Sequence, residues 1–393
     1  MKYVAKAPRE LTYFEAYAQT MPVDDDFAQR LKNQHVEQIA EIFKTPLTGT
    51  YNWDYTEQDN RIKRLYQLGK DLNWDAQTDI NWYQNMRELT DEHSEKFNSF
   101  HFYPSYQAMS QEKKDEFSRH YQAWALSQFL HGEQGALLVA SQLCSCAPTY
   151  NAKLYAASQT FDEARHVEVF SRYLKERLGL MYPINTHLKS ILDKILTDER
   201  WDLKFIGMQV VIEGLALSAF GAIKVATLDP VLNDVLDLVI RDESRHVTFG
   251  VNYLEEFVAC LTDEEREQRA MFAYEACVIS RERLIPTDVF QYFGWDVEEA
   301  REYFLTGTIN QLFRKLLFSR VLPNLKRIGL LTDSVRPKFE ELGILEYENL
   351  AHDGDINWVE LERPLEIKTV PTSPTTNTTL TTTVPLKSAA SMV

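Results

Sequence analysis

A hexapeptide that contains both carboxylates and an imidazole occurs twice in the chain. Its first copy, Asp-Glu-Ala-Arg-His-Val, covers residues 162–167, and its second, Asp-Glu-Ser-Arg-His-Val, covers residues 242–247, an offset of 80. A further glutamate precedes each Glu-x-x-His by 30 residues, at Glu133 and Glu213. Glu and His three residues apart lie on one face of a helix and can contact one metal ion together. The repeat therefore predicts a metal site with two similar halves.

Turn signals lie midway between the paired glutamates. Pro148 is the midpoint of the first pair, and Leu228, beside the helix-starting pair Asp229-Pro230, is the midpoint of the second. A helix that runs ~13 residues to a turn, followed by one that runs back, returns both carboxylates to the same height. Two such hairpins packed face to face bring four glutamates and two histidines to one level. The predicted metal ligands are Glu133, Glu163, His166, Glu213, Glu243 and His246.

The chemistry of this ligand set favours a pair of redox-active metals. Most isolated Glu-x-x-His motifs are ordinary surface or core pairs, but only two of the nine histidines have Glu at i−3, and both belong to the repeat. Four buried carboxylates would be severely unfavourable without cations, because desolvation and like-charge repulsion add. The set is rich in oxygen with one imidazole per metal, which suits iron or manganese better than structural zinc. We expect two iron ions, with Mn/Fe as the alternative.

Charged side chains adjoin the predicted ligands. Asp162 and Asp242 directly precede a ligand glutamate, and Arg165 and Arg245 directly precede a ligand histidine. We expect each aspartate to accept a hydrogen bond from the outer ring N–H of a histidine, and each arginine to hold an aspartate. The alternative is that these residues form ordinary ion pairs on helix faces.

The two halves of the repeat differ in the residues that follow the ligands. We predict a substrate cavity in which small residues open space and large residues form the walls. Glycine inside a helix costs ~1 kcal/mol and usually has a packing reason, so close helix contact is an equally good explanation for Gly250. The candidate cavity residues are Leu137, Ala140, Cys144, Phe170, Leu217, Phe220 and Gly250.

The spacing of apolar residues predicts an all-α protein. Segments with apolar residues at i, i+3, i+4 and i+7 predict helices near 59–72 and over 112–146, 150–178, 186–197, 199–226, 230–260, 263–283 and 308–328. We divide the chain into an N-terminal helical and irregular extension packed on the core (1–110), a helical domain with extra C-terminal helices (111–345), and a tail (346–393). The tail is rich in threonine and proline and cannot bury enough apolar surface to offset its ordering entropy, so we expect it to be disordered.

Composition limits the partners and the location. Net charge −16 argues against a nucleic-acid or anionic-membrane binder, and four cysteines are too few for a disulfide framework. The N-terminus has no apolar signal region, and the longest apolar stretch, Gly214–Ala226, is too short to span a bilayer. We expect a cytoplasmic protein without a membrane span.

At the repeated motif the chain resembles the ferritin-like superfamily of di-iron carboxylate proteins. It is similar in motif style to ribonucleotide reductase small subunits, bacterial multicomponent monooxygenases, aryl-amine N-oxygenases and dimetal halogenases, over roughly residues 112–260. The resemblance implies a ferritin-like four-helix bundle with additional flanking helices, in which a reduced dimetal centre reacts with O₂ and an organic substrate is oxidised. It also implies two sets of ligands, with two glutamates bridging: Glu133, Glu163 and His166 on one metal, and Glu213, Glu243 and His246 on the other.

Departures from these families narrow the function. Phe170 occupies the position of the radical-forming tyrosine of the reductase subunit, and Val239 occupies that of a third histidine in some N-oxygenases, which argues against both subtypes. We predict an O₂-dependent di-iron oxygenase or oxidase that hydroxylates, N-oxygenates, desaturates or halogenates a small organic molecule. The alternatives are a ferroxidase or storage protein without an organic substrate, and a radical-generating subunit.

The source of electrons is also predicted to be external. The sequence contains no Gly-rich phosphate-binding loop that would hold a flavin or nicotinamide nucleotide. A separate reductase or ferredoxin is therefore the expected electron donor, and a homodimer is an expectation from the resemblance alone.

Overall fold

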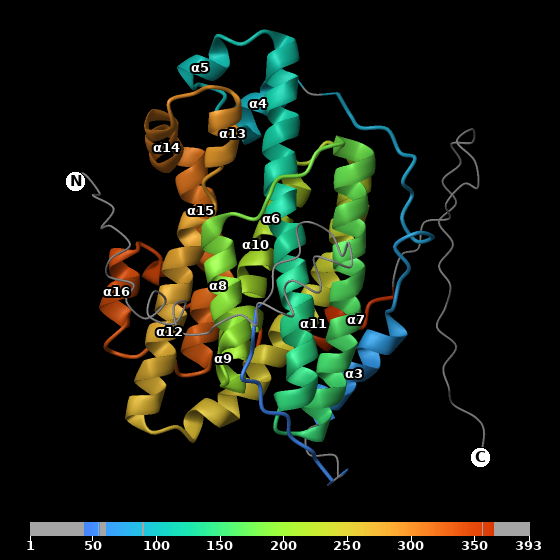
Figure 1. The fold of residues 1–393 in the computed structure, drawn as a ribbon, viewed down its shortest axis with the longest axis vertical. Helices are drawn as coiled ribbons and strands as arrows, with labels where there is room; N and C mark the ends of the chain where they lie inside the picture. Colours follow the sequence, from blue (N-terminus) through green and yellow to red (C-terminus); the bar gives the residue numbers. More distant parts are fainter. Residues whose placement is uncertain (1–42, 54, 56–59, 89, 356, 365–393) are drawn as a thin grey trace, which may run out of the picture.

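A computed structural model describes residues 43–53, 55, 60–88, 90–355 and 357–364. These residues form an all-α bundle whose main helices run along the long axis of the molecule, and none of them forms a strand (Figure 1). The predicted all-α class is confirmed. The predicted helix ends agree with the structure to within two residues, except that α7 ends at Tyr173 and the π-helix η2 (Leu174–Leu178) completes the segment predicted over 150–178. The matching helices are α3 (Asn60–Asp71), α6 (Gln111–Cys146), α7 (Tyr150–Tyr173), α8 (Thr186–Thr197), α11 (Pro230–Ala259), α12 (Asp263–Glu282) and α15 (Thr308–Arg327).

Two of the predicted helices contain a wider π-helical turn. The segment predicted over 199–226 consists of α9 (Trp201–Phe205), the π-helix η3 (Ile206–Ile212) and α10 (Glu213–Ala226) without a break. Helix α7 likewise continues into a π-helix, η2 (Leu174–Leu178). Because π-turns are uncommon and cluster at functional sites, the position of η3 directly before Glu213 points to the predicted metal site.

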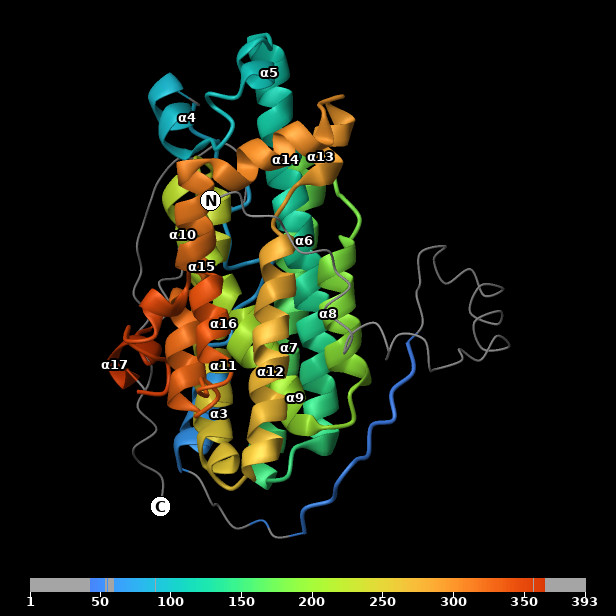
Figure 2. The same cartoon turned by 90° about the vertical axis from the view of Figure 1, so that its left-hand side faces the viewer.

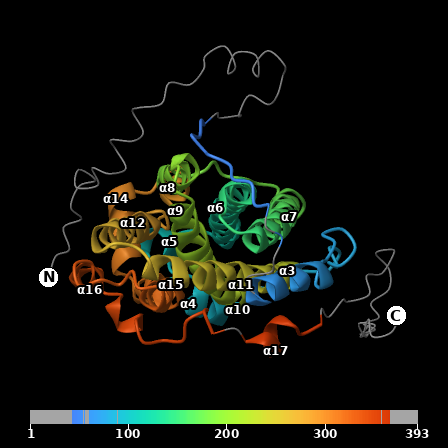
Figure 3. The same cartoon turned by 90° about the horizontal axis from the view of Figure 1, so that it is seen from below.

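Two helical hairpins form the centre of the bundle. Helix α6 packs along α7, α10 packs along α11, and α7 packs against α11; Figure 3 shows these helices end-on. The Thr149 side chain caps α7 by accepting a hydrogen bond from Ala152 N–H, and Asp229 caps α11 by accepting one from Val231 N–H. The turns predicted from the spacing of the glutamates are therefore confirmed.

Flanking helices cover the two hairpins. Helix α3 packs on α7 and α11, α8 packs between α6 and α12, and α15 packs on α10. Short helices lie at the upper end of the molecule, and others lie beside α15 (Figure 2). Those at the end are α4 (Asp91–Phe97), α5 (Pro104–Gln107), α13 (Thr287–Tyr292) and α14 (Val297–Thr306); those beside α15 are α16 (Arg336–Glu341), the 3₁₀ turn η4 (Leu345–Tyr347) and α17 (Trp358–Leu361).

The predicted tail lies partly within the described residues. In its first part, Asp353 accepts hydrogen bonds from Arg320 and Asn324 of α15. Residues 365–393 of the tail and 1–42 of the N-terminal extension lie outside the described residues. The predicted domain boundaries stay predictions.

The continuous helical segment Trp201–Ala226 is long and apolar enough to cross a membrane by length and composition alone. It is longer than the apolar stretch identified in the sequence, but 78% of its most apolar window is buried inside the protein. This is the behaviour of a core helix in a soluble helical domain.

Candidate metal centre

The six predicted ligands lie together in the core between the two hairpins. Helix α6 contributes one of them, α7 and α11 contribute two each, and α10 contributes its first residue. Each is at most 5% exposed, so water is largely excluded from the cluster. In chain order they are Glu133, Glu163, His166, Glu213, Glu243 and His246.

The ligand atoms form two groups of four that share two carboxylates. Within each group, one donor atom per residue lies within 4.8 Å of the others. His166 Nδ1 lies 3.3 Å from Glu163 and 3.1 Å from Glu243, while His246 Nδ1 lies 3.1 Å and 3.7 Å from the same two residues. The first group is Glu133, Glu163, His166 and Glu243; the second is Glu163, Glu213, Glu243 and His246.

Unpaired buried atoms show that protein contacts alone do not satisfy this cluster. Both carboxylate oxygens of Glu243, one oxygen each of Glu163 and Glu213, and Nδ1 of His246 form no hydrogen bond of suitable geometry with the described residues, although Glu243 Oε1 and His246 Nδ1 each lie 3.1 Å from an oppositely charged group. Orphaned acceptors of this kind are costly in a core. Two cations placed between them would provide the missing partners, so the residues fit a dimetal centre.

The negative charges of the clustered carboxylates would also be stabilised by bound cations. Burial and repulsion by Glu243 raise the pKa of Glu133 to about 8, and the same two causes raise the pKa of Glu213 well above its ordinary value. Burial opposes protonation of His166 and His246, but hydrogen bonds and attraction from the surrounding carboxylates raise both imidazole pKa values well above the ordinary range. Without metal, the cluster is thus neutralised by protons, which bound metals would displace.

Removing the metals is expected to make folding stability fall with rising pH. In the metal-free protein, folding raises the pKa of Glu133 from 4.5 to about 8. The protonated Glu133 contributes its full stabilisation of the folded state at a pH below 4.5. As the pH rises from there to about 8, the free energy of unfolding falls by roughly 1.4 kcal/mol per pH unit for this group. Urea unfolding of chelated protein across this range should show the loss, and Glu133→Gln should make it smaller by the share of Glu133, while Glu213 and the two histidines keep the rest. If the free energy of unfolding changed with pH equally in the wild-type and in Glu133→Gln, the raised pKa of Glu133 would be contradicted.

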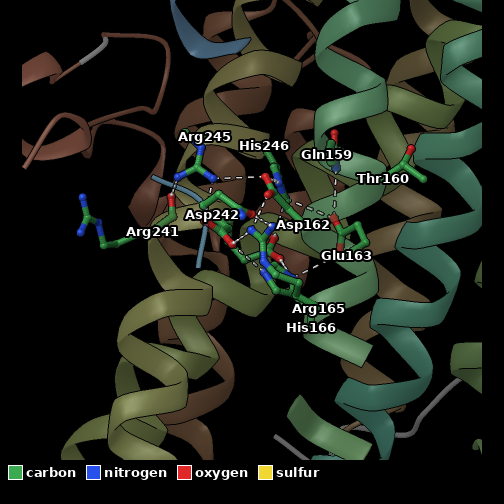
Figure 4. A network of polar contacts seen from close by, with 12 residues as sticks. Gln159, Thr160, Asp162, Glu163, Arg165, His166, Arg241, Asp242, Arg245 and His246 are labelled. Carbon is green, nitrogen blue, oxygen red and sulfur yellow. Dashed lines mark hydrogen bonds and ion pairs between the residues drawn. The ribbon is translucent and has the colours of Figure 1, made fainter. Parts of the chain in front are cut away.

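Each ligand histidine is held by the aspartate of the opposite helix. His166 Nε2 on α7 lies 3.2 Å from Asp242 Oδ2 on α11, and His246 Nε2 on α11 lies 3.2 Å from Asp162 Oδ2 on α7 (Figure 4). We assign the ring proton to Nε2, because an ionised aspartate can only accept. Nδ1 of both rings then faces the carboxylates with its lone pair available for a metal.

Two arginines bridge the two aspartates. Arg165 donates to Asp162 at 2.6 Å and to Asp242 at 3.0 Å, and Arg245 donates to Asp242 at 2.6 Å and to Asp162 at 3.1 Å. Although burial opposes ionisation, Arg245 and His166 hold the pKa of Asp242 well below its ordinary value. The predicted Asp–His and Arg–Asp contacts are thus present. Both Asp–His contacts cross between α7 and α11, and each arginine contacts one aspartate of its own helix and one of the opposite helix.

Trp74 is a further partner of this network that the sequence did not single out. Its indole N–H donates to Asp242 Oδ2 at 2.8 Å, its ring stacks on His166 with 6.3 Å between centroids, and the Arg165 guanidinium lies 4.9 Å above it. Trp74 follows α3 and has no fixed spacing to the repeat. Its role depends on how α3 packs against α7 and α11.

Trp74→Phe is expected to lower metal affinity by about 10-fold, because it removes a donor that holds the aspartate behind His166. Trp82→Phe is the matched control, since the Trp82 indole N–H also donates a buried hydrogen bond, to Ala76 O at 2.9 Å, away from the cluster. Both variants should lose about 1 kcal/mol of stability. Competition titrations with a metal chelator measure the affinity; equal metal affinities for the two variants would contradict this role of Trp74.

Two glutamines support the carboxylates from inside the bundle. Gln159 Nε2 donates to Glu213 at 2.8 Å and to Glu163 at 3.2 Å, and Gln209 Nε2 donates to Gln159 Oε1 at 3.4 Å. Gln159 and Gln209 each stand four residues before a predicted ligand glutamate, hence on the same helix face. This four-residue spacing is the feature of the sequence from which both glutamines could have been predicted.

The structure favours the packing explanation for Gly250. A Cβ added there would lie 2.5 Å from Gln209 Cβ, so this glycine permits close contact between α11 and η3. Phe170 stacks on Phe220 and on Phe129, and the Phe220 ring is tilted against Phe129, with centroids 4.8–6.5 Å apart. Cys144 lies 3.7 Å from the hydroxyl of Thr160, Ala140 and Leu217 are buried in the bundle, and Leu137 is partly exposed.

A small pocket lies beside the carboxylates, and its lining differs from the predicted cavity. Three glutamates of the cluster contribute to its wall, together with apolar residues of α6, η3 and α10 and with Arg283. Its clear space is close to that needed for one water molecule, so a larger ligand must displace side chains. The glutamates are Glu133, Glu213 and Glu243, and the apolar residues are Phe129, Gly132, Ala136, Ile212 and Ala216.

Comparison with known protein families identifies the family to which this chain belongs. Residues 55–317, about two thirds of the chain, match the family described as p-aminobenzoate N-oxygenase AurF. The chain belongs to the AurF family. The matched region includes every predicted ligand and also Val239, which is fully buried. Lack of a third histidine at this position therefore does not separate the chain from the family, contrary to the argument drawn from its sequence.

The solved structures that match the chain include R2-like ligand-binding oxidases. One, with an aerobically reconstituted metal cofactor after photoconversion, is 18% identical, with a TM-score of 0.44, covering 70% of this chain and 94% of that one. Another, with an aerobically reconstituted Mn/Fe cofactor, is 18% identical, with a TM-score of 0.44, covering 72% and 95%. No curated protein matches the chain.

Membership of the AurF family confirms the predicted class of activity. The chain is an O₂-dependent oxidoreductase of the ferritin-like dimetal type. Its buried carboxylate–imidazole cluster fits the dinuclear cofactor predicted for it.

Proposed function

We propose that the chain binds two metal ions, Fe/Fe or Mn/Fe, and uses O₂ to oxidise the nitrogen of a small organic amine. Glu133 and His166 would belong to one ion and Glu213 and His246 to the other, with Glu163 and Glu243 shared. The observation that carries this proposal is the overlap of the two ligand groups in exactly these two carboxylates. When bound, the two ions supply the redox chemistry with O₂.

The protein's own residues would orient the reactants and exclude water. Asp162 and Asp242 keep the proton on the outer nitrogen of each imidazole, and the two arginines fix the aspartates. The pocket beside Glu133 and Glu213 is the place where a substrate can approach the ligands, and its walls are mainly apolar. An apolar, largely dry pocket limits side reactions with water.

The reaction needs two electrons from outside the chain. Its balance is R–NH₂ + O₂ + 2 e⁻ + 2 H⁺ → R–NHOH + H₂O. Because the sequence has no nucleotide-binding loop, we propose a separate reductase or ferredoxin as the donor. A cytoplasmic location and a homodimer stay part of the proposal.

Reconstitution with Fe(II), or with Mn(II) and Fe(II), tests the proposed function. We expect two ions per chain and, with a chemical reductant, labelled O₂ and 4-aminobenzoate, a hydroxylamino or nitro product that contains the label. Mass spectrometry measures the product, and metal analysis measures the loading. Uptake of many irons per chain without oxidation of an amine would support storage instead, and a stable tyrosyl radical would support a radical-generating subunit.

A further inference from the structure

Three exposed aromatic side chains lie beside the turn between α6 and α7. Tyr51 is 86% exposed, Trp53 is 73% exposed and Tyr55 is 61% exposed. The rings of Tyr51 and Trp53 stack with 4.9 Å between their centroids, and the Tyr55 ring meets the edge of the Tyr150 ring at 5.2 Å. Large apolar side chains that gather on a surface usually mark an interaction site. We call Tyr51, Trp53 and Tyr55 the aromatic row.

The segment that carries the aromatic row is fixed to the bundle. Thr50 N–H donates to Ser145 O at 2.9 Å, and Lys153 Nζ donates to Thr50 Oγ1 at 3.1 Å. Asn52 Nδ2 donates to Pro148 O at 3.4 Å, so the segment passes the lower ends of α6 and α7 (Figure 1). Because the residues that alternate with the stacked rings make these contacts, the rings themselves are presented to the outside.

The chemistry of this surface fits an uncharged segment that contains proline. Proline-rich segments bind to surfaces lined by aromatic rings, because their polyproline helix is preformed and loses little entropy on binding. The chain itself contains such a segment at residues 369–386, which include Pro371, Pro374 and Pro385 and no charged residue. This segment therefore matches the three uncharged rings of the aromatic row.

The described part of the chain ends at Pro364, beside α3. Arg64 of α3 donates to Glu362 at 2.6 Å, and its guanidinium lies 3.9 Å above the ring of Trp358. These contacts fix the point from which the segment 369–386 starts. It starts at the helix that directly follows the aromatic row in the sequence.

The aromatic row lies within reach of this segment. Helix α3 runs about 6 Å from Arg64 back to its first residue, and Tyr55 precedes that residue by five positions, which span at most about 18 Å. Pro374 and Pro385 follow Pro364 by 10 and 21 residues, so they can lie up to about 33 and 69 Å from it. The available chain is therefore long enough to cover the aromatic row.

We propose that the aromatic row is the docking site of the chain's own segment 369–386, whose prolines pack on the rings of Tyr51 and Trp53. Tethering makes weak contacts sufficient, since a short linker gives an effective concentration in the mM range. A segment that binds with a Kd of about 1 mM then occupies its site about half of the time. This interaction goes beyond the proposed function, because it involves neither the metals nor the substrate.

Hydroxyl-radical footprinting of the full chain, with oxidation of each residue measured by mass spectrometry, tests the docking. The comparison is between the wild-type and a variant that carries Pro371→Ser, Pro374→Ser and Pro385→Ser. We expect Trp53 to be oxidised at least about 2-fold more slowly in the wild-type, because the docked segment covers its ring. Tyr83, which is 64% exposed in another loop, is the internal control and should be oxidised equally in both proteins.

The reciprocal variant Trp53→Ala should make the segment more accessible to protease. Brief digestion of the folded full chain with proteinase K should cleave residues 369–386 at least about 2-fold faster than in the wild-type. Tyr83→Ala, which also removes an exposed aromatic ring, is the matched control and should leave the cleavage rate unchanged. Because both side chains are largely exposed, neither variant should lower the melting temperature.

Three outcomes would overturn the proposal. One is equal oxidation of Trp53 in the wild-type and in the proline variant, and another is equal cleavage of the segment in Trp53→Ala and Tyr83→Ala. The third is protection of Trp53 that appears only at high protein concentration, since a second copy of the chain would then supply the covering segment.

Discussion

Glu163→Ala is expected to reduce bound metal from two ions per chain to less than one, and to lower O₂-dependent oxidation by more than about 100-fold. Glu163 belongs to both ligand groups, so its loss weakens both sites at once. Removing residues behind the ligands already costs 10- to 100-fold in affinity, and removing a shared ligand should cost more. Metal analysis after dialysis, with titration of Fe(II) under anaerobic conditions, measures the effect.

Glu133→Ala is the matched control for the shared position. Glu133 is buried to a similar degree but belongs to one ligand group, so this variant should keep about one ion per chain. Glu133→Ala should not unfold the metal-free protein, because it removes a buried carboxylate that Glu243 repels. Glu163→Ala also removes a carboxylate that attracts His166 and His246, so circular dichroism is used to compare the folded state of both variants. If Glu163→Ala kept two ions, or if Glu133→Ala lost both, the metal ions would not share the carboxylates that the two ligand groups have in common.

Gly250→Leu is expected to lower both stability and metal affinity. The new Cβ would lie 2.5 Å from Gln209 Cβ, an atom that cannot move without its backbone, so α11 and η3 must separate. Overpacking of this kind costs about 1–3 kcal/mol. Gln209 would then lose its contact with Gln159, the donor to Glu163 and Glu213, and metal affinity should fall by roughly 10-fold. Thermal unfolding and chelator competition measure the two effects.

Gly132→Leu provides the contrasting variant. Gly132 lines the pocket, and a Cβ there meets no atom within 4 Å. We expect this variant to keep its metals and its stability but to bind 4-aminobenzoate at least about 10-fold more weakly, because the leucine occupies space that the ligand needs. Substrate loss with intact metal loading in Gly250→Leu, and not in Gly132→Leu, would instead favour the cavity predicted from the sequence.

The sequence by itself determined the long helices and the set of candidate ligands, but not the short helices α4, α5, α13, α14, α16 and α17. Both follow from local geometry, because the helical period puts Glu and His at i and i+3 on one face, and the turn positions bring residues 30 apart to one height. The 80-residue offset then relates one hairpin to the other, which is why this sequence alone sufficed to propose six ligands.

Only the tertiary structure decided how the hairpins meet. It placed Glu163 and Glu243 between both histidines, paired each histidine with the aspartate of the opposite helix, and brought Trp74 against Asp242. These contacts depend on the rotation and spacing of helices far apart in sequence, which local periodicity does not contain. The same reason explains the pocket, since the open space beside Gly132 arises where residues of α6, η3, α10 and α11 pack together.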